Sequence, residues 1–381
     1  MKTCIDIRPT YNAHATRGVG ILVRNLLRVL EQQCDAKDQL FLVEPGRDLS
    51  SLPRVSQSLP CPRLPRLHNL NWAFNQLLVP RLLKHHGVNL FCATDFHSYI
   101  IPPSGVKQVA LAYDLIPFLF PETMAEQPFL SRIGLKLNFR NLRRCHSIVS
   151  ISEATKQDLT RFMGIPPEKI RVIYPGIDHS LFNQENAVRP MKDPSREIGV
   201  YFLYVGDPEW RKNLRGVLEA LAGMPDNVRL IIAGKLAPKD LRLRQWLDET
   251  NTTGRVLLPG FVPDDDLPRL YGHAVGFVFP TRYEGFGLPV AEAMACGCPV
   301  ITSRNSSLPE VAGPAALYID PARSEDIREA MLTLLHNRQQ RESLSSQGLV
   351  QVQRFTWEQF GSGVRAALIE AGAHPSDQRC C

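Results

Sequence analysis

Short apolar runs of strand type alternate with longer segments of helical periodicity along almost the whole chain. The runs at 3–7 and 201–205 are compact and rich in β-branched or aromatic residues, whereas 21–30 places leucines three and four residues apart. This alternation predicts an α/β protein in which helices cover parallel strands. Strands are predicted at 3–7, 40–43, 88–92, 109–113, 147–152, 170–173, 201–205, 228–233, 256–258, 276–280, 298–302 and 316–319. Helices are predicted at 21–30, 71–86, 129–145, 153–161, 267–274, 290–295, 324–335, 338–350 and 356–370.

The strand–loop–helix series opens twice, at 3–30 and again at 201–205, which predicts two doubly wound domains. Polar, proline-containing sequence at 183–196 is typical of a linker, and the prolines of 52–66 predict a long loop. The expected parts are Rossmann-like domains at 1–185 and 196–355, a last helix at 356–370 and a disordered tail at 371–381.

Composition narrows the class of protein. The 381 residues are 44% hydrophobic and 22% charged, with a formal net charge of +6, which suits a soluble globular protein. An apolar run of transmembrane length and a signal-peptide core are both missing from the sequence, and the nine cysteines are scattered, so we expect a cytoplasmic protein with reduced thiols. Basic residues do not gather with aromatic ones, which argues against nucleic acid as a partner.

The segment 275–320 contains the pattern most typical of a ligand-binding site, and the rest of the chain is organised around it. An apolar strand is followed by Glu284-Gly285-Phe286-Gly287-Leu288-Pro289 and then by a helix that contains Glu292. The two glycines let a ligand approach the backbone, and a helix that opens directly after such a loop favours phosphate at its N-terminus. A glycine loop alone is often merely structural, and glutamates at helical spacing are usually solvated.

The combination of motifs is more specific than its parts. The stretch E-G-F-G-L-P-V-A-E, followed by A-x-A-x-G-x-P-V and P-E-V-A-G, resembles the glutamate-x7-glutamate signature of the retaining glycosyltransferases of family 4. That family has the GT-B fold, in which two doubly wound Rossmann-like domains face a cleft. The resemblance implies that the C-terminal helix at 356–370 crosses back to the first domain. The resemblance implies a retaining hexosyltransferase that binds a nucleotide sugar mainly on the second domain and a saccharide or lipid-linked acceptor mainly on the first.

The resemblance also assigns donor-site residues. It implies that Glu292 binds the ribose, that Glu284 orients the sugar ring, and that Arg211 and Lys212, which follow a strand end, hold the diphosphate. Guanidinium and ammonium groups suit that role, although an isolated Arg-Lys pair is usually a solvated surface. The further donor-side residues are Gly18, Gly20, Gly206, Gly285, Phe286, Gly287 and Leu288.

The acceptor side is expected at the carboxyl ends of strands in the first domain, at His97, Tyr113 and Asp114. Relatives commonly carry histidine-aspartate where this chain has Tyr113-Asp114. Tyrosine is a poor base at neutral pH, so Asp114 is the preferred acceptor-side group. Whether Tyr113 takes over the role of the histidine stays open.

A basic stripe of Arg132, Lys136, Arg140 and Arg144 recurs at i+4 in the predicted helix 129–145, which contains no acid. A basic amphipathic helix is typical of a contact with anionic membrane, and the alternative is an ordinary solvated face.

The identity of the donor stays open. The stretches A-Y-D-L-I-P-F and I-D-I-R-P look similar to bacterial mannosyltransferases of O-antigen and exopolysaccharide synthesis, which favours GDP-mannose. UDP-glucose, UDP-GlcNAc and other donors remain alternatives, as does a non-catalytic nucleotide- or sugar-binding module. No cofactor and no obligatory metal is expected, because an Asp-x-Asp motif is missing from every predicted strand end.

Overall fold

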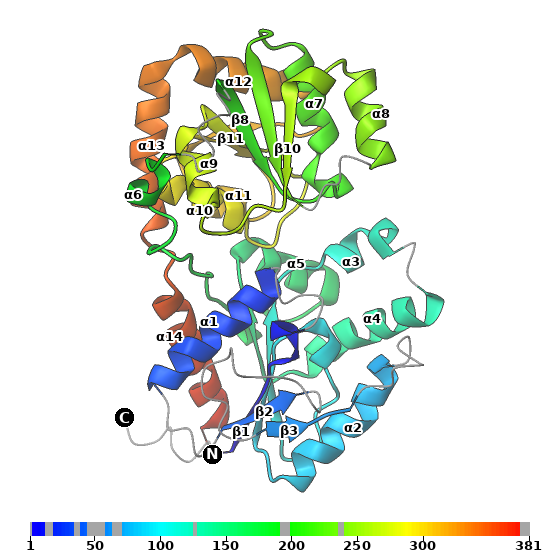
Figure 1. Cartoon of the computed structure of the whole chain (residues 1–381). Helices are drawn as coiled ribbons and strands as arrows, with labels where there is room; N and C mark the ends of the chain where they lie inside the picture. Colours follow the sequence, from blue (N-terminus) through cyan, green and yellow to red (C-terminus); the bar gives the residue numbers. More distant parts are fainter. Residues whose placement is uncertain are drawn as a thin grey trace. The chain divides into compact units, whose positions relative to one another are not determined.

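The computed structural model describes residues 2–11, 18–33, 39–43, 58–62, 71–124, 128–190, 199–234 and 240–373. The chain divides into two compact units, residues 1–176 with 357–381, and residues 177–356. Each unit contains one parallel sheet flanked by helices (Figure 1).

The first unit is built on a seven-stranded parallel sheet with the order β3-β2-β1-β4-β5-β6-β7. The order reverses between β1 and β4, which makes this pair the topological switch point of the unit. The strands are β1 (Thr3–Asp6), β2 (Gln39–Val43), β3 (Ser58–Pro60), β4 (Leu90–Ala93), β5 (Lys107–Ala112), β6 (Ser147–Ser150) and β7 (Ile170–Val172). The helices are α1 (Gly18–Gln33), α2 (Asn71–His85), α3 (Ile116–Leu119), α4 (Phe129–Asn141), α5 (Glu153–Met163) and α14 (Trp357–Gly372).

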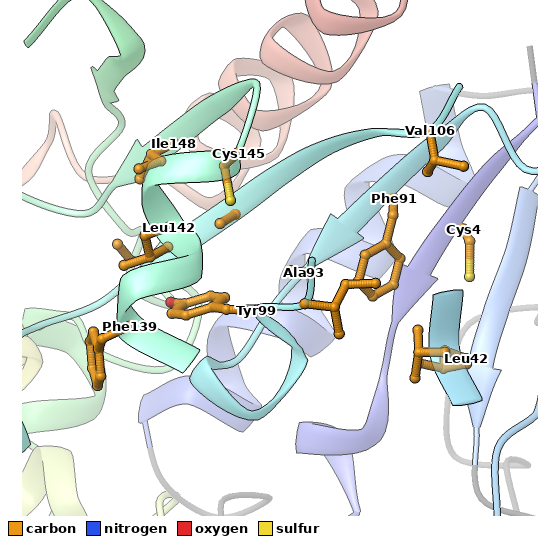
Figure 2. Close-up of a cluster of buried hydrophobic side chains, with 14 of the residues drawn as sticks. Cys4, Leu42, Phe91, Ala93, Tyr99, Val106, Phe139, Leu142, Cys145 and Ile148 are labelled. Atoms are coloured by element: carbon orange, nitrogen blue, oxygen red, sulfur yellow. The ribbon is translucent and has the colours of Figure 1, made fainter. Parts of the chain in front are cut away.

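Alternate residues of each strand supply the two buried faces of this sheet. On β5, Ala110 and Ala112 belong to a core cluster that also contains Phe139 of α4 and Leu83 of α2. Figure 2 shows part of this cluster, with Tyr99 beside Phe139 and Leu142. Because both faces are buried, the strands are almost continuously apolar, and this is why their positions were predictable from the sequence.

The last helix of the chain belongs to the first unit. α14 packs beside α1 and against β4, β5 and β6 (Figure 1). Gly361 of α14 lies so close to Val29 of α1 that a Cβ there would stand 2.4 Å from the valine side chain. A small residue is therefore required at this helix crossing.

The second unit is built on a six-stranded parallel sheet with the order β10-β9-β8-β11-β12-β13 and a switch point between β8 and β11. The strands are β8 (Val200–Val205), β9 (Val228–Ala233), β10 (Val256–Gly260), β11 (Gly276–Phe279), β12 (Val300–Ser303) and β13 (Ala316–Ile319). The helices are α6 (Gln184–Ala187), α7 (Leu214–Ala222), α8 (Leu241–Glu249), α9 (Leu267–His273), α10 (Leu288–Ala295), α11 (Leu308–Ala312), α12 (Ser324–His336) and α13 (Arg338–Val352).

The boundary between the units lies earlier than the sequence predicted. Residues 177–185 were expected in the first domain, but they belong to the second unit. The short helix α6 packs on α9, where the carbonyl of Ala187 approaches Gly272. Ile177 also forms a parallel β-bridge with Thr356, and its N–H donates to the carbonyl of Phe355 at 3.2 Å. The two points at which the chain passes between the units are thus bonded to each other.

Three local predictions were wrong. The stretch 52–66 contains the edge strand β3, and the predicted linker 183–196 contains α6. The helix expected at 129–145 ends at Asn141, and the 3₁₀ turn η6 (Leu142–Arg144) follows it. Residues 374–381 of the expected tail lie outside the described residues.

Candidate active site

Two predicted donor motifs meet at the switch point of the second unit. Residues 206–213 follow β8 and residues 281–287 follow β11, and these strands are neighbours in the sheet. The carbonyl of Arg211 accepts hydrogen bonds from the N–H of Arg282, at 2.6 Å, and from Thr281 Oγ1, at 3.1 Å. These bonds hold the two loops together at the place where open α/β sheets bind ligands.

Arg211 joins the two motifs through its side chain. Its Nη1 donates to Glu284 Oε1 at 2.5 Å and to the carbonyl of Tyr283 at 3.1 Å, while its Nε donates to Glu209 Oε2 at 2.8 Å. The side chains of Arg211 and Glu284 are 12% and 14% exposed, so this ion pair is largely withdrawn from water. A guanidinium held in this way is pre-oriented for a second anion.

Lys212 lies against the end of β8. A Cβ on Gly206 would stand 2.9 Å from Lys212 Nζ and 3.0 Å from its Cδ, and the φ of Gly206 is +145°. Only glycine gives the lysine this path across the backbone without strain. The structure therefore places Gly206, Arg211 and Lys212 in one loop.

The glycine loop is fastened by two serines that sequence analysis missed. The N–H of Glu284 donates to Ser306 Oγ at 3.0 Å, and Ser307 Oγ shares its one hydrogen between the carbonyls of Glu284 and Phe286, at 2.9 and 2.7 Å. Ser306 itself has a φ of +44°, which is unusual for a serine. Serines after a strand are common, so no local pattern singled these two out.

The helix that follows the loop begins where the sequence predicted a phosphate-binding start. Gly287 is the N-cap of α10 with a φ of +103°, and a Cβ there would stand 2.8 Å from Leu308 Cδ2. Leu288 is the first residue of α10 and Pro289 the second, so proline occupies a position whose N–H has no partner within a helix. Gly285 and Phe286, which precede this turn in the chain, are buried.

Glu292 is partly buried on α10 beside Tyr271 of α9. Burial, reinforced by the negative charge of Asp264, raises the pKa of the Glu292 carboxyl to about 8, against a smaller lowering by the Tyr271 hydroxyl. The Tyr271 hydroxyl stands 3.5 Å from Glu292 Oε2, at the long limit of a hydrogen bond. Burial thus favours the protonated form of Glu292 in the free protein.

In the first unit, Gly18 and Gly20 do not form the predicted loop. Both lie in the first turn of α1, which begins at Gly18 rather than at residue 21. Residues 12–17, which connect β1 to this helix, lie outside the described residues. The prediction of a glycine loop was therefore wrong for these two positions, because helical hydrogen bonding extends one turn earlier than the leucine pattern indicated.

The acceptor-side candidates stand near the carboxyl ends of β4 and β5. Tyr113 is buried, and its hydroxyl donates to the carbonyl of Thr94 at 2.7 Å. Burial, together with the charge of Asp95, raises the pKa of Tyr113 well above 10, so this phenol stays protonated and cannot act as a base. Asp114 Oδ1 accepts from the N–H of Ile116 at 2.9 Å, and His97 is exposed, with its ring against Phe96.

The basic stripe lies on the surface of the first unit. Lys136, Arg140 and Arg144 are exposed and Arg132 is partly exposed, although Arg144 belongs to η6 rather than to α4. Over the described ranges, no helix is long and apolar enough to cross a membrane, and no cluster of three or more His, Cys, Asp or Glu side chains has the arrangement of a metal site.

Comparison with known proteins decides the family. Residues 191–350 match the family Glycosyl transferases group 1, and residues 16–181 match Glycosyltransferase Family 4. The chain is 31% identical over 280 residues to O-antigen chain mannosyltransferase B of Escherichia coli, a match that covers 72% of this chain and 71% of that protein. The chain belongs to glycosyltransferase family 4.

Two further similarities concern the length and the fold of this family 4 glycosyltransferase. It is 29% identical over 275 residues to the serotype-specific mannosyltransferase WbdA of Escherichia coli, which covers 69% of this chain but only 34% of that longer protein. Sucrose-phosphate synthase from Thermosynechococcus elongatus has the same fold, with a TM-score of 0.79 at 19% identity over 98% of this chain and 100% of that one. The predicted GT-B fold class and the predicted glycosyltransferase activity are confirmed.

Proposed function

We propose that this glycosyltransferase moves mannose from GDP-mannose to a saccharide or lipid-linked saccharide acceptor in the synthesis of a cell-surface polysaccharide. The similarity to O-antigen chain mannosyltransferase B and to WbdA supports mannose as the sugar. The described residues contain nothing that selects guanine over uracil, so UDP-glucose and UDP-GlcNAc are the competing donors.

The observation that carries the proposal is the ion pair between Arg211 and Glu284 at the switch point of the second unit. In our proposal, Arg211 and Lys212 bind the donor diphosphate, and the N–H groups at the start of α10 add to this anion site. Glu284 orients the sugar ring, and Glu292 accepts hydrogen bonds from the ribose hydroxyls. No obligatory metal is proposed, because the arginine and lysine supply the positive charge.

Retention of configuration follows from attack and departure on the same face of the sugar. The bond between the anomeric carbon and the phosphate oxygen breaks, and a bond from that carbon to an acceptor hydroxyl oxygen forms. The departing phosphate oxygen takes the proton of that hydroxyl, so no side chain has to act as a base. Arg211 and Lys212 stabilise the charge that develops on the departing diphosphate. Asp114 lies on the acceptor side in this scheme, and Tyr113 stays bound to the Thr94 carbonyl.

A panel of nucleotide sugars tests the donor site. We expect GDP-mannose to raise the Tm of the wild-type protein, because a ligand that binds only the folded state stabilises it. Glu292→Ala should lose most of this shift, whereas Glu329→Ala, at an exposed glutamate of α12, should retain it. The panel also contains UDP-glucose, UDP-GlcNAc and the free nucleotides, each with and without EDTA.

The outcomes separate the alternatives. If a UDP-sugar raises the Tm and GDP-mannose does not, the donor is that UDP-sugar, and the assignment of the donor site stands. A shift without sugar transfer to any acceptor would favour a non-catalytic binding module. If no nucleotide or nucleotide sugar shifts the Tm, the assignment of the donor site is wrong.

We also propose that α4 rests on an anionic membrane where a lipid-linked acceptor would be presented. The outer face of this helix combines Lys136 and Arg140 with the exposed apolar side chains of Phe129, Leu130 and Leu137, which are 71%, 45% and 38% exposed. Buried Leu135 and Phe139 anchor the opposite face to the core. Cations beside exposed aromatic and aliphatic groups are characteristic of helices that lie in the plane of a membrane interface.

Changing Arg132, Lys136, Arg140 and Arg144 to glutamate is expected to abolish sedimentation with vesicles that contain phosphatidylglycerol. Each basic residue near an anionic surface contributes about 1 kcal/mol, so reversing four charges removes the attraction entirely. Glutamate at Arg242 and Arg244, exposed residues of α8 in the second unit, is the matched control and should leave sedimentation unchanged. Equal sedimentation of the wild type and the fourfold variant would make the stripe an ordinary solvated face.

A further inference from the structure

The carboxyl ends of β1 and β4 meet at the switch point of the first unit, and side-chain hydrogen bonds lock them together. Thr94 Oγ1 donates to the backbone carbonyl of Asp6, and the Tyr113 hydroxyl donates to the carbonyl of Thr94. The ends of three neighbouring strands, β1, β4 and β5, are therefore fixed in position. A rigid sheet edge of this kind is where this class of fold presents its ligand-binding groups.

Most polar groups at this edge are already engaged by the protein. Arg8 donates from Nε and Nη2 to the carboxylate of Asp6, at 2.9 and 2.7 Å, and from Nη1 to Asn75 Oδ1 at 3.1 Å. The Tyr99 hydroxyl donates to the carbonyl of Leu111. These groups stabilise the edge and have little capacity left for a ligand.

Asp95 differs from them. Its residue is 3% exposed, and its Oδ1 is buried with no hydrogen-bond partner in the described part of the chain. The turn it begins, η4 (Phe96–Ser98), is held by other bonds: the Asp95 N–H donates to Ser98 Oγ at 3.1 Å, and both Ser98 Oγ and the Ser98 N–H donate to the Asp95 carbonyl. Asp95 and Ser98 form a capping box, which leaves Oδ1 unused.

A buried carboxylate oxygen without a donor is costly, so its presence calls for a reason. The Tyr113 hydroxyl bonds to the carbonyl of Thr94, the residue before Asp95, and the charge of Asp95 contributes to the raised pKa of both Tyr99 and Tyr113. Both phenolic hydrogens point to backbone carbonyls instead, so neither satisfies Asp95. Within the described part of the chain no donor reaches Asp95 Oδ1, so this oxygen is available to a donor that a ligand supplies.

We propose that Asp95 Oδ1 accepts a hydrogen bond from a hydroxyl group of the acceptor saccharide and thereby positions the acceptor on the first unit. A carboxylate only accepts, and saccharides offer several hydroxyl donors in a fixed arrangement. The inference rests on the proposed function, because it assumes that the acceptor is a saccharide. It assigns an acceptor-binding residue that the motif-based candidates His97, Tyr113 and Asp114 did not include.

Asp95→Asn is the decisive variant. Asparagine keeps one oxygen for the capping box and replaces the unused acceptor with an N–H₂ donor of the same size. Wild type and variant are assayed by mass spectrometry with the best donor and a panel of p-nitrophenyl hexosides and N-acetylhexosaminides. The panel glycoside that the wild type uses best serves as the acceptor for kinetics. We expect the KM for this acceptor to rise about 10- to 100-fold, while the donor Kd and the Tm stay close to those of the wild type.

Ser98→Ala is the matched control, since it removes the other half of the capping box and leaves the carboxylate in place. It should lower the Tm and leave the acceptor KM nearly unchanged. An unchanged acceptor KM in Asp95→Asn would overturn the proposal and assign Oδ1 to a buried water. A loss of donor affinity in Asp95→Asn would overturn it as well.

The proposed function can fail separately. If the wild type binds a donor but transfers sugar to no glycoside of the panel, a saccharide does not occupy this edge and the inference fails, while the donor site stands. If the wild type binds no donor, the proposed function itself fails.

Discussion

Replacing Arg211 by alanine is expected to lower kcat/KM for sugar transfer by about 100- to 1,000-fold, the loss that removal of one preorganised charge-stabilising donor causes in enzymes. Arg211 is the side chain that bonds both to the loop after β8, through Glu209, and to the loop after β11, through Glu284. Without it, the diphosphate loses its guanidinium, and Glu284 keeps a mostly buried carboxylate without its ion pair. We therefore expect the unfolding free energy of the ligand-free protein to fall as well, by about 1–3 kcal/mol.

The matched control for this variant is Arg215→Ala. Arg215 is 54% exposed on α7 and pairs with Glu219 and Glu249 on the surface, where ion pairs contribute little. Steady-state kinetics and thermal unfolding of both variants provide the comparison. A kcat/KM for Arg211→Ala within about threefold of that for Arg215→Ala would remove Arg211 from the proposed mechanism, since the transition-state role predicts a far larger loss.

Replacing Glu292 by glutamine is expected to weaken donor binding and to stabilise the ligand-free protein at high pH. The pKa of Glu292 is about 8 in the folded protein, whereas an unfolded glutamate has a pKa near 4.3. Between these values the folded state holds a proton that the unfolded state has released, so the free energy of unfolding falls as pH rises from about 4.5 to 8. Glutamine does not ionise, so the variant does not lose unfolding free energy in this way as the pH rises.

The variant should therefore gain stability over the wild type above pH 8 and show no gain below about pH 4.5. We expect about 2 kcal/mol at pH 8.5, less than the full shift in pKa implies, because Glu292 is only partly buried. Donor affinity should fall about 10- to 100-fold at the same pH, since the ribose hydroxyls lose a charged acceptor.

Chemical denaturation across pH and calorimetric titration of the donor measure the two effects. Calorimetry in buffers of different ionisation enthalpy should also show that the wild type releases a proton when it binds donor at pH 7, and that Glu292→Gln does not. Equal pH dependence of stability in the two proteins would show that Glu292 is not the titrating group.

The sequence predicted the strands well, because strands buried on both faces of a parallel sheet are almost continuously apolar. It failed at β3, a three-residue edge strand that ends in a proline and shows no such run. It also failed at α6, where Asn183 supplies the N-cap, since its Oδ1 accepts from the N–H of Asn186 within polar sequence that is equally typical of a linker. Short elements of this kind depend on tertiary contacts that no local pattern encodes.

The candidate site was predictable as far as it consists of motifs. Glu284, Arg211 and Lys212 were singled out by sequence, and the structure brings the loops that carry them together. Ser306, Ser307 and Asp95 were not, because their importance comes from hydrogen bonds made, or left unmade, with residues distant along the chain. The composition of a sequence and the spacing of its residues cannot reveal that a side-chain oxygen lacks a hydrogen-bond partner.

The β-bridge between Ile177 and Thr356 has a consequence for how this enzyme could change its donor. The chain enters the second unit at Ile177 and leaves it at Thr356, and these two residues lie side by side. The second unit therefore has the form of an inserted segment whose two ends meet. A segment of that kind can be exchanged between related genes, because its two junctions lie side by side in the folded protein and the path of the remaining chain does not change. Recombination at residues 176–177 and 356–357 would thus replace the sheet that carries Arg211 and Glu284 while leaving the edge with Asp95 intact, and so offers a route to new polysaccharides by shuffling modules.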